Sequence, residues 1–212
     1  MKYLRAISAF IAASVAISVT CAGQTPDYSE YILTPKAPAT PRINGPRVYG
    51  QSPDVDFLFK IPASGERPMT FSAKGLPKGL KLDPETGIIS GRARKAGSYN
   101  VTLTATNSLG SDSKPLRLEI GEDKLLLTPP MGWSSWNCFG NTVSQEHAEA
   151  MAKAFIDLGL DQYGWSYINL DDGWQYDRGG KYNAIMPNSK FPDMMGLSDY
   201  IHSLGLKFGI YS

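Results

Sequence analysis

The sequence has little cysteine, little histidine and almost no net charge, and each scarcity excludes a class of protein. Only two cysteines occur in 212 residues, so neither a disulfide framework nor a cysteine-based metal cluster can be built. A formal net charge of +1 leaves no basic field that would recruit nucleic acid. The hydrophobic content of 42% and the charged content of 19% are typical of a folded protein and exclude a largely disordered one.

Long hydrophobic runs are also missing, apart from a short one near the start. Residues 1–5 are basic, residues 6–20 are mostly Ala, Ile, Val and Ser, and small residues follow at 21–23. This order is typical of a signal peptide over residues 1–23 and predicts a secreted or periplasmic protein. The run is too short for a helix that spans the bilayer core, so we expect no stable membrane insertion. A lipoprotein at Cys21 is the weaker alternative, because Thr20 is a poor residue just before a lipidated cysteine.

Glycine and proline, at 21 and 15 residues, divide the rest of the chain. Residues 24–41 are rich in Pro, Thr and Ala and predict an extended linker. Residues 42–121 contain short alternating segments between turn residues, which predicts an immunoglobulin-like β-sandwich. In the segment 99–106, for example, one face would carry Tyr99, Val101, Leu103 and Ala105. The acidic Asp83 and Glu85 fit a turn and not a metal site.

Residues 125–212, after a charged hinge at 122–124, change to alternating strands and helices. We expect strands near 131–137, 167–170 and 206–212, helices from Thr142 to Leu158 and from Pro192 to Leu204, and a long loop from Trp174 to Lys190. Such a βαβαβ series predicts parallel strands and matches the first units of a (β/α)8 TIM barrel. A barrel of this kind needs eight strands, so we expect a truncated barrel and a chain that is a fragment.

The segment 165–174 predicts a buried strand that ends in two adjacent carboxylates, Asp171 and Asp172. Alternation puts Tyr167, Asn169 and Asp171 on one face of the strand, and Ile168 and Leu170 on the other. Acidic residues at the C-terminal end of a parallel strand are typical of barrel active sites. Ordinary turn chemistry explains an Asp-Asp-Gly sequence equally simply, because aspartate side chains bond to nearby backbone.

Aromatic residues are expected at the same end of the sheet: Trp133 and Trp136 after the first strand and Tyr211 after the third. Carboxylates and an indole face together favour a sugar site, since hydroxyls bond to carboxylates and a pyranose packs on an indole. Packing in the core is an equally good explanation for either tryptophan. No cofactor or metal is implied by these residues.

Two resemblances sharpen these expectations. Residues 75–91 (GLPKGLKLDPETGIISG) and 97–107 (GSYNVTLTATN) resemble the "putative Ig", cadherin-like modules of secreted bacterial proteins, which are more often spacers than binding sites. Residues 128–140 (TPPMGWSSWNCFG), 164–174 (GWSYINLDDGW) and 200–212 (YIHSLGLKFGIYS) resemble the start of glycoside hydrolase family 27, the α-galactosidase family.

The second resemblance implies a secreted, retaining exo-α-galactosidase acting on terminal α-D-galactosyl residues of oligosaccharides or polysaccharides. By position, Trp136 would wall the galactose site, and Asp171 and Asp172 would accept hydrogen bonds from the hydroxyls at C4 and C6. The nucleophile and the acid/base are expected beyond Ser212, so no catalytic residue is expected here and the fragment should be inactive. Ser134 and Gly173 depart from the family, which usually has Asn and often a disulfide cysteine at these positions.

Other functions stay open: an α-N-acetylgalactosaminidase or β-L-arabinopyranosidase of the same family, or a non-catalytic carbohydrate-binding module built on the sandwich. Three further residues carry weak signals. Cys138 is expected to be a small buried thiol, and His147 and His202 are expected on solvated helix faces remote from any chemistry.

Overall fold

The computed structural model describes residues 29–212, so the signal peptide expected over residues 1–23 lies outside the described part of the chain. The chain divides into two compact units between Lys36 and Ala37. The described part of the first unit contains a 3-10 turn, η1 (Ser29–Tyr31), and exposed residues up to Lys36. No helix among residues 29–212 is long and apolar enough to cross a membrane.

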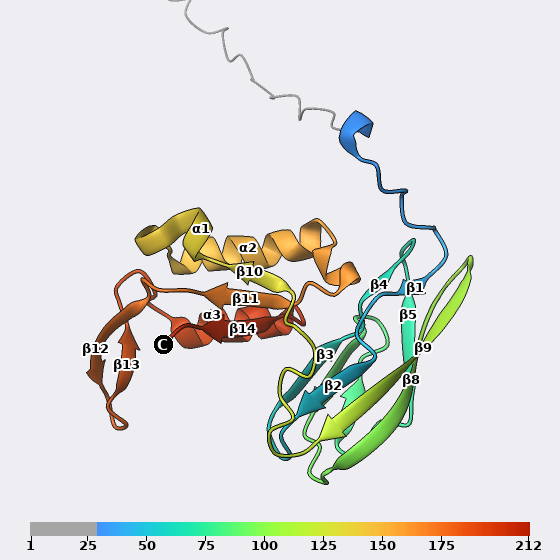
Figure 1. Ribbon diagram of the computed structural model, residues 1–212, viewed down its shortest axis with the longest axis horizontal. Coiled ribbons are helices and arrows are strands. Elements are labelled where there is room, and N and C mark those ends of the chain that lie inside the picture. Colours follow the sequence, from blue (N-terminus) through green and yellow to red (C-terminus); the bar gives the residue numbers. More distant parts are fainter. Residues whose placement is uncertain (1–28) are drawn as a thin grey trace, which may run out of the picture. The chain divides into compact units, whose positions relative to one another are not determined.

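Residues 42–120 of the second unit form a β-sandwich (Figure 1). One sheet has the strand order β2-β9-β8-β5 and the other the order β3-β7-β6, while β1 pairs with β4. The strands are β1 (Arg42–Ile43), β2 (Val48–Gln51), β3 (Phe57–Lys60), β4 (Ala63–Ser64), β5 (Thr70–Lys74), β6 (Leu80–Leu82), β7 (Ile88–Gly91), β8 (Gly97–Asn107) and β9 (Gly110–Ile120). The immunoglobulin-like fold expected from the sequence is confirmed.

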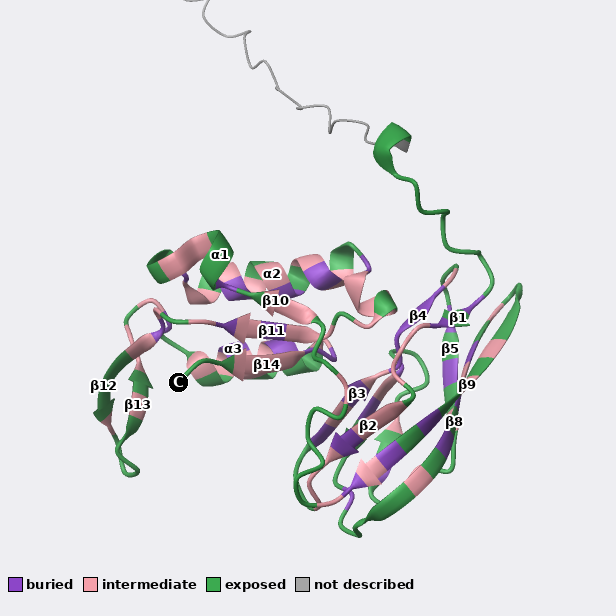
Figure 2. Ribbon diagram, in the orientation of Figure 1, coloured by how far each residue is buried: buried purple, intermediate pink, exposed green. Residues whose placement is uncertain are grey.

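Alternation along β8 and β9 forms the sandwich core, as the sequence predicted. Val101, Leu103 and Ala105 on β8 are buried, and the outward residues between them are not, which Figure 2 shows as alternating colours along the strand. The turn between β6 and β7 is fixed by Asp83, whose Oδ1 accepts the backbone N–H groups of Glu85 and Thr86. These two hydrogen bonds favour the charged carboxylate and lower the pKa of Asp83.

Residues 132–212, named here the β/α region, contain a parallel three-stranded sheet in the order β10-β11-β14. Its elements are β10 (Gly132–Ser134), α1 (Trp136–Phe139), η2 (Gly140–Thr142), α2 (Gln145–Asp157), η3 (Leu160–Tyr163), β11 (Tyr167–Leu170), β12 (Gln175–Gly179), β13 (Ala184–Pro187), α3 (Met194–Ser203) and β14 (Lys207–Ile210). The expected βαβαβ series with parallel strands is therefore confirmed.

The two long helices pack on one face of this sheet. Ile168 and Leu170 of β11 are buried in one cluster with Ala152 of α2 and with Leu197 and Ile201 of α3. The opposite face, named here the inner face, carries the alternate residues of the three strands in register: Gly132, Ser134, Tyr167, Asn169, Lys207 and Gly209. The division of β11 residues between two faces follows the sequence prediction.

Helix α2 differs from its prediction at both ends. Ser144 and not Thr142 is the N-cap, and its side chain accepts the N–H of His147. Thr142 instead ends the turn η2, with its hydroxyl bonded to Phe139 O at 2.6 Å. Leu158 follows the last helical residue and is exposed, so the buried stripe ends at Phe155 and the prediction that Leu158 extends it was wrong.

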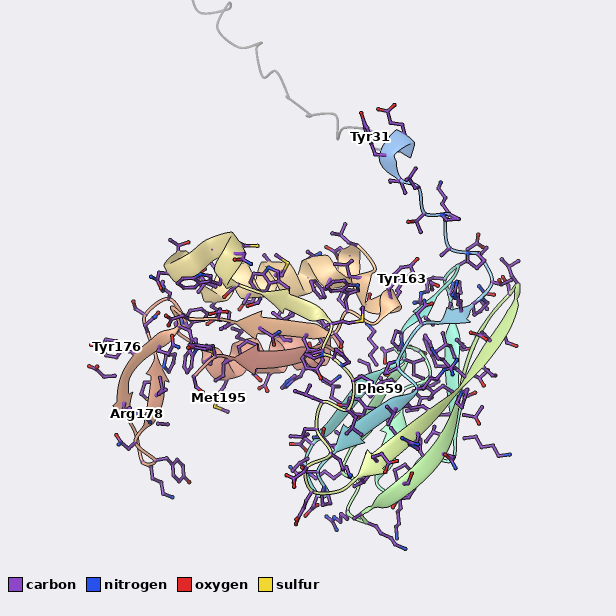
Figure 3. The ribbon with its side chains drawn as sticks, in the orientation of Figure 1. Tyr31, Phe59, Tyr163, Tyr176, Arg178 and Met195 are labelled. Carbon is purple, nitrogen blue, oxygen red and sulfur yellow. The ribbon has the colours of Figure 1, made fainter. Side chains whose placement is uncertain are left out.

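The segment expected as a long loop, 174–190, contains an antiparallel hairpin. Strands β12 and β13 pair with an irregularity between Gln175 and Arg178. No residue of β12 or β13 is fully buried, so their sequences carry no clear apolar pattern, which is why the hairpin was missed. In Figure 1 the hairpin follows the C-terminal end of β11, and Figure 3 shows Tyr176 and Arg178 pointing outward from β12.

Candidate functional site

The candidate site lies at the C-terminal ends of β10, β11 and β14, where Asp171 follows the inner-face residue Asn169. Ser134, the last residue of β10, donates its hydroxyl hydrogen to Asp171 Oδ2 at 3.2 Å. The other carboxylate oxygen, Oδ1, accepts the backbone N–H of Asp172 at 2.8 Å. Both oxygens of Asp171 therefore have a partner that orients them, and each keeps lone pairs for a further donor.

Ser135 joins the ends of the two strands and was not identified from the sequence. Its backbone N–H donates to Asn169 O at 3.1 Å, and its hydroxyl accepts the backbone N–H of Asp171 at 2.9 Å. Ser135 is fully buried, so these groups have no access to water and depend on each other. The signal that could have found it is a small polar residue directly after a strand and between two tryptophans.

Asp172 starts the loop and is exposed. Its Oδ1 accepts the N–H of Gly173 at 2.8 Å, so each aspartate binds the backbone of the residue after it. The turn interpretation of this pair is therefore correct, and it does not compete with a binding role, because the same bonds hold the carboxylates at the strand end. Gly173 has φ +98°, a conformation unfavourable for the cysteine that many family members have there.

The two tryptophans after the first strand have different environments. Trp136 starts α1 and is 45% exposed, so its ring is available at this end of the sheet. Trp133 packs against the helix-side cluster and lies edge-on to Phe139 with the ring centroids 6.0 Å apart. Of the two tryptophans expected near the site, Trp133 is therefore partly buried against the core, because β10 turns its side chain to the helix face.

A third tryptophan fixes the end of β14. Trp174 is 4% exposed, and its Nε1–H donates to Tyr211 O at 2.8 Å. Tyr211 N–H in turn donates to Leu170 O at 2.8 Å, which extends the β11–β14 pairing past the strand. The side chain of Tyr211 remains exposed. The structure thus brings Asp171, Asp172, Trp136 and Tyr211 to the ends of adjacent strands.

On the inner face, the side chain of Asn169 lies close to the backbone of Gly209. A Cβ atom added there would lie 2.2 Å from Asn169 Oδ1, so the Asn169 amide lies directly on the glycine of the neighbouring strand. Any larger residue at position 209 would displace Asn169, the residue two positions before Asp171.

Cys138 and His147 depart from their expected surroundings. Cys138 is exposed and not buried, because α1 turns it outward, and its sulfur receives the Nε1–H of Trp133 at 3.4 Å. His147 stacks on Phe139 with the ring centroids 4.1 Å apart, and its Nδ1 is buried with no hydrogen-bond partner in the described part of the chain. His202 is exposed, as expected. Across residues 29–212, no group of three or more His, Cys, Asp or Glu is arranged to hold a metal ion.

Comparison with known proteins assigns both parts of the chain. Residues 31–121 match the family described as "Putative Ig domain", and residues 128–212 match the family described as "Alpha galactosidase A". An α-galactosidase A from Cellvibrio japonicus is 46% identical over 92 residues, which is 42% of this chain and 22% of that protein. An α-galactosidase from Cyamopsis tetragonoloba is 41% identical over 99 residues, which is 46% of this chain and 24% of that protein. The chain spans about a quarter of the length of these curated relatives.

One solved structure matches across both parts. It is a putative alpha-galactosidase from Bacteroides fragilis, 48% identical, with a TM-score of 0.77, and the match covers 82% of this chain and 37% of that one. A second solved chain from the same organism, a putative alpha-galactosidase/melibiase, matches with 48% identity and a TM-score of 0.78. The chain therefore consists of an N-terminal Ig module followed by part of an α-galactosidase domain of glycoside hydrolase family 27.

Proposed function

We propose that the complete protein is a secreted, retaining exo-α-galactosidase, and that this chain supplies part of its galactose site. Membership of the α-galactosidase family supports the substrate class. The observation that carries the proposal is the position of Asp171: its carboxylate is oriented by Ser134 and by the Asp172 N–H at the C-terminal end of a parallel strand. That is the end at which enzymes built on β/α barrels bind their substrates.

The proposed binding roles follow from the free lone pairs. Asp171 and Asp172 accept hydrogen bonds from the galactose hydroxyls at C4 and C6, which are charge-assisted bonds and stronger than those between neutral groups. Trp136 presents an exposed indole on the neighbouring strand end, against which the apolar face of the sugar packs. The axial C4 hydroxyl distinguishes galactose from glucose, so a carboxylate directed at it confers specificity.

Cleavage of the glycosidic bond needs two further carboxylates. In a retaining enzyme one attacks the anomeric carbon and the other protonates the departing oxygen, with about 5–5.5 Å between the two groups. Asp171 and Asp172 are engaged with the backbone that follows them and serve binding in this proposal. The proposed nucleophile and acid/base lie on later strands of a closed (β/α)8 barrel, so residues 1–212 alone bind the sugar weakly and hydrolyse nothing.

Binding is tested with methyl α-D-galactoside by saturation-transfer difference NMR on the purified 212-residue chain. We expect saturation-transfer signals from methyl α-D-galactoside that decrease when free galactose is added. Methyl α-D-glucoside should give no such signals. Asp171→Asn and Asp172→Asn should each weaken binding about tenfold or more, since bonds to charged groups contribute about 1.5–3 kcal/mol. Asp177→Asn, an exposed aspartate on β12, is the matched control and should change nothing. Equal binding by all variants would exclude the proposed site.

Catalysis is tested separately with p-nitrophenyl α-D-galactoside. We expect no turnover by the pure chain and turnover by the full-length enzyme. Turnover by the chain itself would contradict the assignment of the catalytic carboxylates to later strands.

Secretion is the remaining part of the proposal, and it rests on the basic, apolar and small-residue order of residues 1–23. N-terminal sequencing of the exported protein should give a start near Gln24. Lipid attachment at Cys21 would instead establish the lipoprotein alternative.

A further inference from the structure

The sandwich and the β/α region share a polar contact built around Lys60. Lys60 ends β3 of the sandwich, and its Nζ lies 2.7 Å from Asp161 Oδ2 in η3. The same ammonium donates to Leu204 O, at the end of α3, at 3.2 Å. The side chains of Lys60 and Asp161 are only 21% and 9% exposed, so this ion pair is largely removed from water.

A second lysine crosses the junction in the opposite direction. Lys207 starts β14, and its ammonium lies 4.9 Å from the ring centroid of Tyr49 and 6.0 Å from that of Phe59, both in the sandwich. The ring of Tyr167 on β11 lies 5.1 Å from the same nitrogen. The ammonium is therefore held by three aromatic rings, and no ion pair to it occurs among residues 29–212. Figure 3 labels Phe59, the β3 member of this cage.

A hydrogen bond completes the contact: Asn44 donates its side-chain N–H to Gln162 O at 3.0 Å. All the β/α-region partners lie before or at the starts of β11 and β14, or at the end of α3. That end of the sheet is opposite to the end that carries Asp171 and Tyr211. The contact is thus remote from the candidate sugar site and leaves it open.

The burial of the Lys60–Asp161 ion pair and of the Lys207 ammonium argues against a loosely tethered sandwich. Within residues 29–212, Asp161 Oδ1 is buried with no hydrogen-bond partner, and the burial of a charged carboxylate is costly unless a counter-ion is held beside it. A partly open pocket of about 630 Å³ also lies at the junction, lined among others by Tyr49, Lys207 and residues 125–129, so the two parts are not packed together continuously there. The specific contacts across the junction include the Lys60–Asp161 ion pair, the Lys207 cage and the Asn44–Gln162 hydrogen bond.

We propose that the Ig sandwich is a docked, structural part of the enzyme that caps the N-terminal ends of the sheet strands through Lys60–Asp161 and the Lys207 cage. This role differs from that of the spacer that such modules usually provide. It is consistent with two solved relatives, each of which matches 82% of this chain, more than either part alone. The proposal does not depend on galactosidase activity.

The test is ¹⁵N NMR relaxation on the 212-residue chain, which reports whether two parts tumble together. We expect one rotational correlation time for amides of the sandwich and of the β/α region. Lys207→Met combined with Lys60→Met should separate them, which shortens the correlation times of both parts. Lys181→Met is the matched control, because Lys181 lies 5.2 Å from the Tyr182 ring within the exposed hairpin and touches no junction residue. It should leave the common correlation time unchanged.

A double-mutant cycle on Lys60→Met and Asp161→Asn gives an independent measurement. Each single variant should lower the Tm by about 2–4 °C or more, and the double variant by less than the sum, because the second change removes a charge already unpaired. Lys207→Arg should keep the docked state. Two correlation times in the wild-type chain, or additive effects in the cycle, would overturn the proposal. If a variant does not fold, the wild-type relaxation alone decides.

Discussion

The hydroxyl of Ser135 accepts the backbone N–H of Asp171 at 2.9 Å, across 36 positions of sequence. Ser135 also donates its own N–H to Asn169 O, so one buried residue hydrogen-bonds the end of β10 to the end of β11. The binding geometry proposed for Asp171 depends on this link, because the two hydrogen bonds of Ser135 fix the position of the Asp171 backbone at the end of β11.

Replacing Ser135 by Ala should therefore destabilise the β/α region. The change leaves the part-buried Asp171 N–H without its acceptor, which costs about 1–3 kcal/mol. Thermal or urea unfolding followed by tryptophan fluorescence measures the loss. The matched control is Ser203→Ala on the exposed end of α3, which should stay within about 0.5 kcal/mol of wild type. Equal effects at the two serines would contradict the assigned role.

Gly209→Ala should be destabilising by about 1–3 kcal/mol, because the new methyl group would lie 2.2 Å from Asn169 Oδ1. Shortening the opposing side chain in the double variant Asn169→Ala/Gly209→Ala should recover part of the loss, since it removes the clash. The measurement is the same unfolding experiment, with each single variant compared to the pair. An additive double variant would show that the two residues do not touch.

His147→Phe should leave stability unchanged or raise it. The buried Nδ1 of His147 has no hydrogen-bond partner among the residues that the structure describes, and the ring already stacks on Phe139. An apolar ring therefore keeps the contact and removes an unsatisfied polar atom. Calorimetric Tm values for wild type and variant measure the effect. His202→Phe, on an exposed helix position, serves as the control and should give no gain. A clear loss for His147→Phe would indicate an essential bond of the imidazole.

The burial of Lys207 predicts a pH dependence of stability, because desolvation of the ammonium opposes its attraction to the three rings. Burial lowers the pKa of Lys207 to about 8, below its usual value of 10.5. Between these values the unfolded chain binds the proton that the folded chain has released, so the free energy of unfolding should rise with pH from about 8 to 10. Burial also raises the pKa of Tyr49 and of Tyr167 above 10. Above pH 10 these two tyrosines ionise in the unfolded chain but stay protonated in the folded one, so the free energy of unfolding should fall again.

Urea unfolding at several pH values tests this profile, and ¹³C-methylated lysine NMR follows Lys207 directly. Its resonance should titrate near pH 8 and be missing in Lys207→Arg, which should also lack the rise in stability above pH 8. A Lys207 resonance that titrates together with the exposed lysines would contradict the buried environment.

Local patterns were sufficient for much of the fold. Alternation in 99–106 and in 167–170 identified the buried faces correctly, because side chains of a strand alternate whatever the strand pairs with. Helix α3 was also found, since Leu197 and Ile201 repeat on one side and Gly205 follows. The hairpin β12–β13 was missed and Leu158 was misplaced, because exposed strands and helix ends carry a weak apolar signal.

The sequence by itself determined that two adjacent carboxylates follow a buried parallel strand, preceded by an Ig sandwich, because strand alternation and turn residues act over a few positions. Only the tertiary structure decided that Ser135 and Ser134 hold Asp171, that Trp174 fixes Tyr211, and that Lys207 lies among the rings of two domains. Those contacts join residues far apart in the chain, and they depend on strand register and on how the two domains pack, which no local pattern encodes.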